Sequence, residues 1–369
     1  MATRRSRIVR YAVVGLGHIA QVAVLPAFAH AGRNSRVVAL VSDDPAKRRA
    51  LSKKYEIEHA YPYEEYEACL EQVDAVYIAL PNSLHAEYTI RAARAGVHVL
   101  CEKPMAVTAA ECQRMIEACR AHRVKLMIAY RLHFEEINLD AIDMVRRGRL
   151  GEPKFFNSSF AMTVRRGDIR TKADLGGGTL YDIGVYCINA ARYLFRAEPT
   201  HVTAISVNSG IARLDAIDET TGAVLRFDGG RLAAFVTSFN ATDVASYRIV
   251  GTRGQLHVAP AYEYAERLAY ELTVNGKTTR KRIGKRDQFA AELLYFSDCI
   301  LKKREPEPSG EEGLQDVRIV QALYKSAETG KAVALPPLKR SKRPTGRQRI
   351  TRPGVRTPRL VGVQSPNED

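Results

Sequence analysis

The chain has 369 residues, of which 46% are hydrophobic and 26% charged, so it is of ordinary globular composition and too long for a single core. No apolar run approaches the ~20 residues that span a membrane, and no cleavable leader is recognisable, so we expect a cytoplasmic protein without membrane association. The six cysteines include no Cys-x-x-Cys pair, which favours free thiols and no metal site.

The net charge of +15 is concentrated at the two ends of the chain, and residues 1–8 are a basic extension. Nine basic and two acidic residues lie between Pro336 and Asp369. This stretch has few apolar residues, so we expect residues 336–369 to be disordered. A basic tail can contact nucleic acid, but this one has no aromatic side chain to stack on bases, and we expect no specific nucleic-acid partner.

A buried strand is predicted over residues 9–14, and a helix follows to about residue 31, bent at Pro26. Between them lies the pattern Gly-x-Gly-x-x-Ala, which in this context is a dinucleotide fingerprint. Gly15 allows the tight turn, Gly17 lets the backbone approach a pyrophosphate, and the helix start attracts the anion. The predicted cofactor contacts here are Gly15, Leu16, Gly17, His18 and Ile19.

The tip of the second strand, residues 36–41, bears on the choice of cofactor. Ser42 stands where an NAD site usually has an acid, and Asp44 can cap the next helix with Pro45 in its first position. Ser42, Lys47 and Arg48 could then meet the 2′-phosphate of NADP. Asp43 argues against this because a carboxylate repels phosphate, so NADP is favoured and NAD stays the alternative.

Strands over 74–80, 97–100 and 124–129 alternate with helices, one of them with a Thr108–Glu111 capping box, which predicts a parallel sheet. Pro104 cannot donate a backbone hydrogen bond and disfavours a helical Lys103, so Lys103 is expected at a strand tip, where ligands bind. Taken alone, Glu-Lys-Pro would more often be a solvated lysine in an ordinary strand-to-helix turn. We assign residues 9–128 to a Rossmann-type dinucleotide-binding domain.

Residues 129–335 are predicted to form an α+β domain, so the fold class is α/β. Its large, mostly antiparallel open sheet uses β-rich runs near 154–164, 200–209, 221–228, 231–239, 245–251 and 268–274. Helices are expected near 135–147, 177–195, 286–303 and 311–329. One exposed face on such a sheet favours a homodimer or homotetramer.

The run from Gly176 to Asn189 places Asp182, Tyr186 and Asn189 on one stripe of a helix. A carboxylate, a phenol and an amide in one line can hold a polyol by its hydroxyls, so these three are candidate substrate-binding residues together with Lys103. The alternative is a capped helix whose tyrosine reaches water.

These motifs together resemble the Gfo/Idh/MocA oxidoreductases, most closely glucose–fructose oxidoreductase and NADP-dependent aldose dehydrogenases. The resemblance covers about residues 9–335 and is carried by residues 14–17, 81–87, 101–106, 176–193 and 311–318. It implies a catalytic group of Lys103, Asp182 and Tyr186. It also implies cofactor contacts from Ser42, Lys47, Pro81, Asn82, His85, Glu102, Lys103 and Arg131.

Three departures from the family pattern stand out. The tryptophan that many relatives carry before the glycine run is absent, and Ile169-Arg170 occupies that neighbourhood. Asp43 replaces a smaller residue. The arm that covers the cofactor in glucose–fructose oxidoreductase is also missing, which suggests a cofactor freer to leave.

Three functions are compatible with the sequence. The first is an NADP-dependent aldose oxidoreductase in which Tyr186 is the general base, Lys103 supports it and Asp182 fixes the sugar. The second is a transhydrogenating sugar oxidoreductase that keeps NADP(H) bound. The third, less favoured, is a nucleotide-sensing regulator without catalysis.

Overall fold

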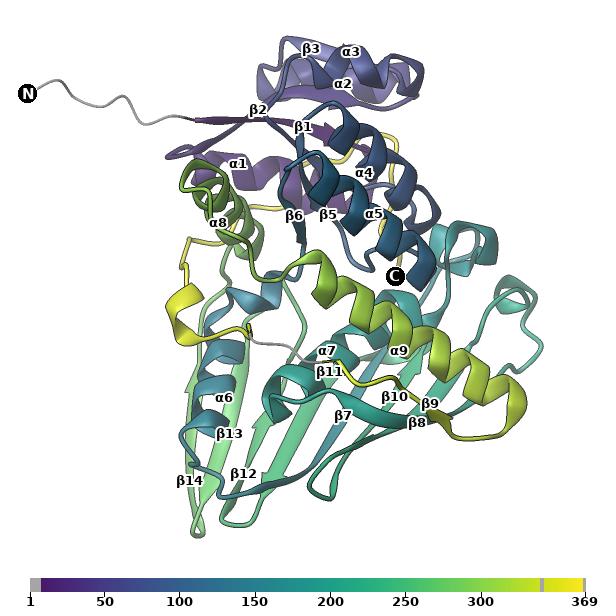
Figure 1. Ribbon diagram of the computed structural model, residues 1–369, viewed down its shortest axis with the longest axis vertical. Coiled ribbons are helices and arrows are strands. Elements are labelled where there is room, and N and C mark those ends of the chain that lie inside the picture. Colours follow the sequence, from purple (N-terminus) through teal and green to yellow (C-terminus); the bar gives the residue numbers. More distant parts are fainter. Residues whose placement is uncertain (1–7, 339–341, 368–369) are drawn as a thin grey trace, which may run out of the picture.

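The computed structural model describes residues 8–338 and 342–367, and the predicted basic extension lies almost entirely outside them. The chain forms two sheets with helices packed between and around them (Figure 1). Among the described helices, none combines the length and apolarity needed to cross a membrane.

The first sheet is parallel, with its six strands in the order β3-β2-β1-β4-β5-β6. This order and the right-handed crossovers it requires are those of a Rossmann domain. The strands are β1 (Val9–Val14), β2 (Ser35–Val41), β3 (His59–Tyr61), β4 (Ala75–Ile78), β5 (His98–Cys101) and β6 (Leu126–Ile128).

Local sequence explains the helices of this half. Asp44 accepts hydrogen bonds from two amides at the start of α2, and Thr108 and Glu111 form the predicted capping box of α5. The predicted first helix begins as a π-helical turn, Ala20–Val24, before Pro26. The helices are α1 (Leu25–Ala31), α2 (Pro45–Tyr55), α3 (Tyr66–Leu70), α4 (His85–Arg94) and α5 (Ala109–Ala121).

The second sheet has nine strands in the order β14-β13-β12-β11-β7-β10-β9-β8-β15 and is antiparallel except for β7 and β10. It confirms the predicted large, mostly antiparallel sheet. Its strands are β7 (Pro153–Thr163), β8 (Pro199–Val207), β9 (Thr220–Phe227), β10 (Arg231–Ser238), β11 (Asn240–Gly251), β12 (Gly254–Val258), β13 (Ala269–Val274), β14 (Lys277–Arg282) and β15 (Val333–Ala334).

One face of this sheet is covered by α6 (Glu136–Arg146), α7 (Val185–Phe195) and α9 (Gly310–Thr329), with α7 on β7 and α9 on β8 (Figure 1). The other face carries exposed apolar side chains, and Ile205 is 71% exposed there. A further helix, α8 (Gln288–Leu301), packs on α1 and β1, whereas the sequence predicts it within the second domain. A late segment thus completes the core of the nucleotide-binding half.

The C-terminal segment differs most from the expectation of disorder. Residues 342–367 are hydrogen-bonded to the body of the protein at many points, and their yellow trace runs along both halves of the molecule and ends between them (Figure 1). The segment forms few elements of its own and is held mainly through its backbone and its arginines. Residues 339–341, 368 and 369 lie outside the described residues.

Candidate functional site

A cavity of about 950 Å³ lies where the carboxyl ends of the Rossmann strands face the second sheet. This is the position at which open α/β sheets bind ligands. Both halves of the chain line it, and so do the last described residues. Of the predicted site residues, Gly17, His18, Ile19, Lys47, Asn82, His85, Glu102, Lys103, Arg131, Asp182 and Tyr186 line this cavity.

The glycine turn after β1 has the shape that a dinucleotide requires. Gly15 has a φ of 91°, and a Cβ there would lie 2.5 Å from the carbonyl oxygen of Ala79, so only glycine fits. Gly17, in contrast, has no heavy atom within 4 Å of its Cβ position and faces the cavity. The open space beside this backbone, at the start of a helical segment, fits a pyrophosphate.

The tip of β2 places one of the three predicted 2′-phosphate ligands on the cavity wall. Lys47 lines the cavity, with its Nζ 3.6 Å from the carboxylate of Asp44. Ser42 is buried, and the guanidinium of Arg48 donates a hydrogen bond to the carbonyl oxygen of Ser42. Lys47 is therefore on the cavity wall, whereas Ser42 and Arg48 are not, because the Arg48 guanidinium is bonded to the backbone at the end of β2.

The tips of β4 and β5 are tied to each other. The ring of buried His85 lies between the carbonyl oxygens of Leu80 and Pro104, at 2.9 Å from each. Asn82 donates a 2.8 Å hydrogen bond to the carbonyl oxygen of Gly176 in the second half. These polar side chains fix the strand tips around the cavity. Gly15, Leu16 and Pro81 lie beside the cavity rather than on its wall.

Lys103, Asp182 and Tyr186 meet in this cavity, as the sequence predicted. The Lys103 Nζ lies 3.0 Å from Asp182 Oδ1, 2.8 Å from the Asp182 carbonyl oxygen and 4.8 Å from the centre of the Tyr186 ring. The two halves of the chain thus contribute an ammonium, a carboxylate and a phenol to one place. The backbone that carries Asp182 is a π-helical turn, Leu180–Gly184, directly before α7.

Two arginines complete this group. Arg170 Nε lies 2.6 Å from Asp182 Oδ2, so Asp182 has a cation on each oxygen. Arg131 Nη2 donates a 3.2 Å hydrogen bond to the Tyr186 hydroxyl and is itself held by the carbonyl oxygen of Tyr262. The cation that directly contacts the phenol oxygen is therefore Arg131, whereas Lys103 lies against the ring.

The charges of the group follow from these contacts. Burial opposes ionisation of Asp182, but Arg170 and Lys103 outweigh it and hold the pKa of that carboxyl well below its usual range. Burial likewise opposes the charge on Lys103, but Asp182, Tyr186 and Glu102 together outweigh it and raise the pKa of Lys103. At neutral pH both groups are ionised, as an orienting ion pair requires.

Two family models match the chain. One, described as an oxidoreductase family with an NAD-binding Rossmann fold, matches residues 9–130, and the GFO/IDH/MocA C-terminal domain matches residues 139–257. The chain belongs to the Gfo/Idh/MocA oxidoreductase family. The resemblance expected from the sequence motifs is confirmed.

Relatives in this family share most of the chain. The D-xylose 1-dehydrogenase (NADP(+)) of Haloarcula marismortui is 35% identical over 89% of this chain and 93% of the relative, and a second such enzyme, of Haloferax volcanii, is 33% identical over 88% and 99%. The crystal structure of aldose-aldose oxidoreductase from Caulobacter crescentus, complexed with glycerol, has a TM-score of 0.85 and 38% identity over 89% of this chain and 100% of that chain.

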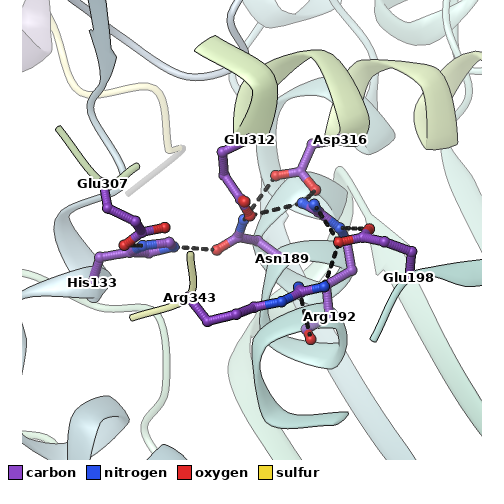
Figure 2. A network of polar contacts seen from close by, with 8 residues as sticks. All are labelled: His133, Asn189, Arg192, Glu198, Glu307, Glu312, Asp316 and Arg343. Atoms are coloured by element: carbon purple, nitrogen blue, oxygen red, sulfur yellow. Dashed lines mark hydrogen bonds and ion pairs between the residues drawn. The ribbon is translucent and has the colours of Figure 1, made fainter. Parts of the chain in front are cut away.

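Asn189, which the helix stripe predicts to bind the substrate, lies away from the site. It is buried on the face of α7 that packs against α9 and does not line the cavity. Its amide donates to Glu312 and Asp316, both at 2.8 Å, and its oxygen faces His133 at 2.9 Å (Figure 2). The predicted sugar ligand is therefore a partner in a buried polar network.

Sequence reasoning also missed two parts of the cavity wall. In the sequence, Arg170 only occupies the neighbourhood where many relatives carry a tryptophan, and nothing around it shows that it reaches Asp182, twelve residues on. Residues 362–367 line the cavity although their composition predicts disorder. Neither contact leaves a periodicity or a motif that could have revealed it.

Proposed function

We propose that this protein is an NADP-dependent sugar oxidoreductase that transfers hydride between the nicotinamide and the anomeric carbon of an aldose. The observation that supports this most is the convergence of Lys103, Asp182 and Tyr186 at the cavity that holds the glycine turn. The Haloarcula and Haloferax relatives make D-xylose the first substrate to test. When bound, the nicotinamide supplies the hydride acceptor.

In this proposal the protein groups handle the proton. Tyr186 takes the proton of the anomeric hydroxyl. The cations of Arg131 and Lys103 stabilise negative charge on the two oxygens that exchange this proton, the phenol oxygen and the anomeric oxygen. Asp182 accepts from a neighbouring sugar hydroxyl and holds Lys103 in place. Asn82, His85 and Glu102 line the part of the wall next to these groups and would position the nicotinamide ribose.

A substrate screen tests the proposal. Aldoses and ketoses are supplied with NAD and with NADP, and reduced nicotinamide is followed by its absorbance. We expect oxidation of an aldose, D-xylose first, with NADP preferred. Absence of turnover with every sugar, while NADP still binds, would leave only a nucleotide-binding protein, as in the regulator hypothesis.

We expect Lys47 to set the preference for NADP. Lys47 lines the cavity just after the tip of β2, and the carboxylate of Asp43 at that tip accepts a hydrogen bond from the Tyr63 amide at 2.9 Å. Lys47→Ala is expected to weaken NADP binding about tenfold or more and to leave NAD binding nearly unchanged. Lys53→Ala, on the exposed side of α2, is the matched control; equal losses for NADP and NAD would contradict the assignment.

We expect Arg170 to position Asp182 and to keep it ionised. Arg170→Met removes the 2.6 Å contact, so the pKa of Asp182 rises toward its ordinary value and the acid limb of kcat/KM moves to higher pH than in the wild type. A merely structural role would lower activity without moving this limb. The exposed neighbour substitution Arg166→Met is the control and is expected to leave the pH profile unchanged.

A second candidate is a transhydrogenating oxidoreductase that keeps NADP(H) bound while one sugar is oxidised and another is reduced. The similarity to aldose-aldose oxidoreductase and the C-terminal residues on the cavity wall favour it. Absorbance of the purified protein before and after adding an aldose alone separates the two candidates. That the protein is cytoplasmic and forms a homodimer or homotetramer stays a prediction from the sequence.

A further inference from the structure

The C-terminal segment is bound to the body of the protein at several residues that precede its cavity-lining part. The side chain of Arg343 is 8% exposed, and its Nη2 lies 2.7 Å from Glu198 Oε1. Gln348 donates a 2.9 Å hydrogen bond to the carbonyl oxygen of Glu307, and the Asp287 amide donates to the carbonyl oxygen of Arg352 at 3.1 Å. These contacts lead the chain past the second half and onto the nucleotide-binding half.

At the glycine turn the segment is paired with a single buried side chain. The Val361 amide donates to Gln21 Oε1 at 2.8 Å, and Gln21 Nε2 donates to the Val361 carbonyl oxygen at 2.9 Å. The same Nε2 lies 2.9 Å from the carbonyl oxygen of Leu16, inside the turn. Gln21 is 1% exposed, so the segment is tied directly to the backbone that would carry the pyrophosphate.

The next residue lies against the candidate 2′-phosphate ligand. Gly362 has a φ of 58°, and a Cβ there would be 3.2 Å from the Cε of Lys47. A larger residue would be strained and would press on that lysine. From Gly362 to Asn367 every residue lines the cavity.

The end of the segment crosses to the second half. The Arg165 amide donates to the carbonyl oxygen of Pro366 at 2.9 Å, and Arg165 Nε donates to that of Ser365 at 2.7 Å. Asn367 Nδ2 lies 3.1 Å from Asp243 Oδ2. Residues 361–367 therefore bridge the two halves along the cavity wall, held at both ends by hydrogen bonds to the body.

We propose that residues 361–367 are a clamp that helps to enclose the bound dinucleotide and slows its release. This rests on the proposed function, because it requires NADP(H) in the cavity. A clamp held at Gln21 and at Arg165 must open at one end before the cofactor can leave past it. Slow release would favour the second candidate function, in which NADP(H) stays bound through successive turnovers, and it reverses our expectation of a freely leaving cofactor.

The test measures cofactor release directly. A chain that ends at Leu360 and the full-length Val361→Pro variant, which lacks the amide donated to Gln21, are loaded with NADPH and desalted. Excess NADP is added, and release is followed by the loss of NADPH fluorescence. We expect release about tenfold faster or more in both variants, with a chain that ends at Asn367 behaving as the full chain.

One outcome overturns the clamp and leaves the enzymatic proposal intact. If both variants fold by circular dichroism, bind NADPH and release it within about twofold of the full chain, the clamp is wrong, whatever the sugar turnover. If the shortened chain does not fold, Val361→Pro alone decides. Failure of the full chain to bind NADPH, or to oxidise any aldose when it is bound, instead refutes the proposed function.

Discussion

Tyr186→Phe is expected to lower the turnover of aldose oxidation by about a hundredfold or more, because it removes the proposed base and leaves the ring in place. A hundredfold corresponds to about 2.7 kcal/mol of transition-state stabilisation. Lys103→Met is expected to have an effect of the same size, since it removes the ammonium 3.0 Å from Asp182 and 4.8 Å from the phenol ring. Steady-state kinetics with NADP and the best aldose from the screen measure both.

Two matched substitutions separate chemistry from packing. Tyr181 precedes Tyr186 by one helical turn and a residue, and its hydroxyl donates to the carbonyl oxygen of Val107, off the cavity wall. Tyr181→Phe is therefore expected to keep turnover within about fivefold, and the exposed Lys172→Met likewise. NADP affinity is expected to be nearly unchanged in all four variants. Wild-type turnover in Tyr186→Phe and Lys103→Met would refute the assignment.

Much of the fold could be predicted because its signals are local. The strand and glycine turn at the start, the Asp44 cap and the Thr108–Glu111 capping box need only a few consecutive residues. The strand β14 was missed because its sequence, Lys-Thr-Thr-Arg-Lys-Arg, has no apolar face. It is an edge strand, ordered by backbone pairing with β13 and needing no burial.

The site was predictable only in part, because a stripe of polar residues on a helix does not reveal which other part of the chain each residue contacts. Asp182 and Tyr186 reach the cavity, whereas Asn189 on the same stripe meets the carboxylates of α9. The motif around residues 311–318 carries the family resemblance, yet Glu312 and Asp316 hold α7 rather than a substrate. Part of what identifies the family is thus a packing network, and only a long-range contact shows which part.

The order of the C-terminal segment could not be predicted either, because it also depends on long-range contacts. Its composition predicts disorder because it cannot bury much apolar surface of its own. The body supplies what the segment lacks: Gln21 pairs with its backbone, and Glu198 and Asp140 bind its arginines. Such ordering depends on partners placed 145 to 340 residues earlier in the chain, so no short window of the sequence contains the information.

Arg192→Met is expected to destabilise the protein by roughly 3–5 kcal/mol, the cost of breaking a buried ion pair from one side. Arg192 is 0% exposed, and its guanidinium contacts Glu198 at 2.7 Å, Glu312 at 2.8 Å and also Asp316 (Figure 2). Without it, Glu312 and Asp316 lose a buried counter-charge. Urea unfolding monitored by circular dichroism at neutral pH measures the loss.

The cause of that loss can be separated from a cavity effect by pH and by a second variant. Burial raises the pKa of Asp316 even in the wild type, and losing Arg192 raises it further. A carboxyl whose folded-state pKa exceeds its unfolded value contributes stability at low pH that is lost as pH rises, so the deficit of Arg192→Met should shrink as pH falls toward about 5. Adding Glu312→Gln and Asp316→Asn removes the two carboxylate charges that Arg192 balances, and this is expected to restore part of the stability at neutral pH.

Arg146→Met, on the surface of α6, is the control and should cost at most about 1 kcal/mol. A deficit that is independent of pH and is not relieved in the triple variant would mean that Arg192 acts through its packing and not its charge.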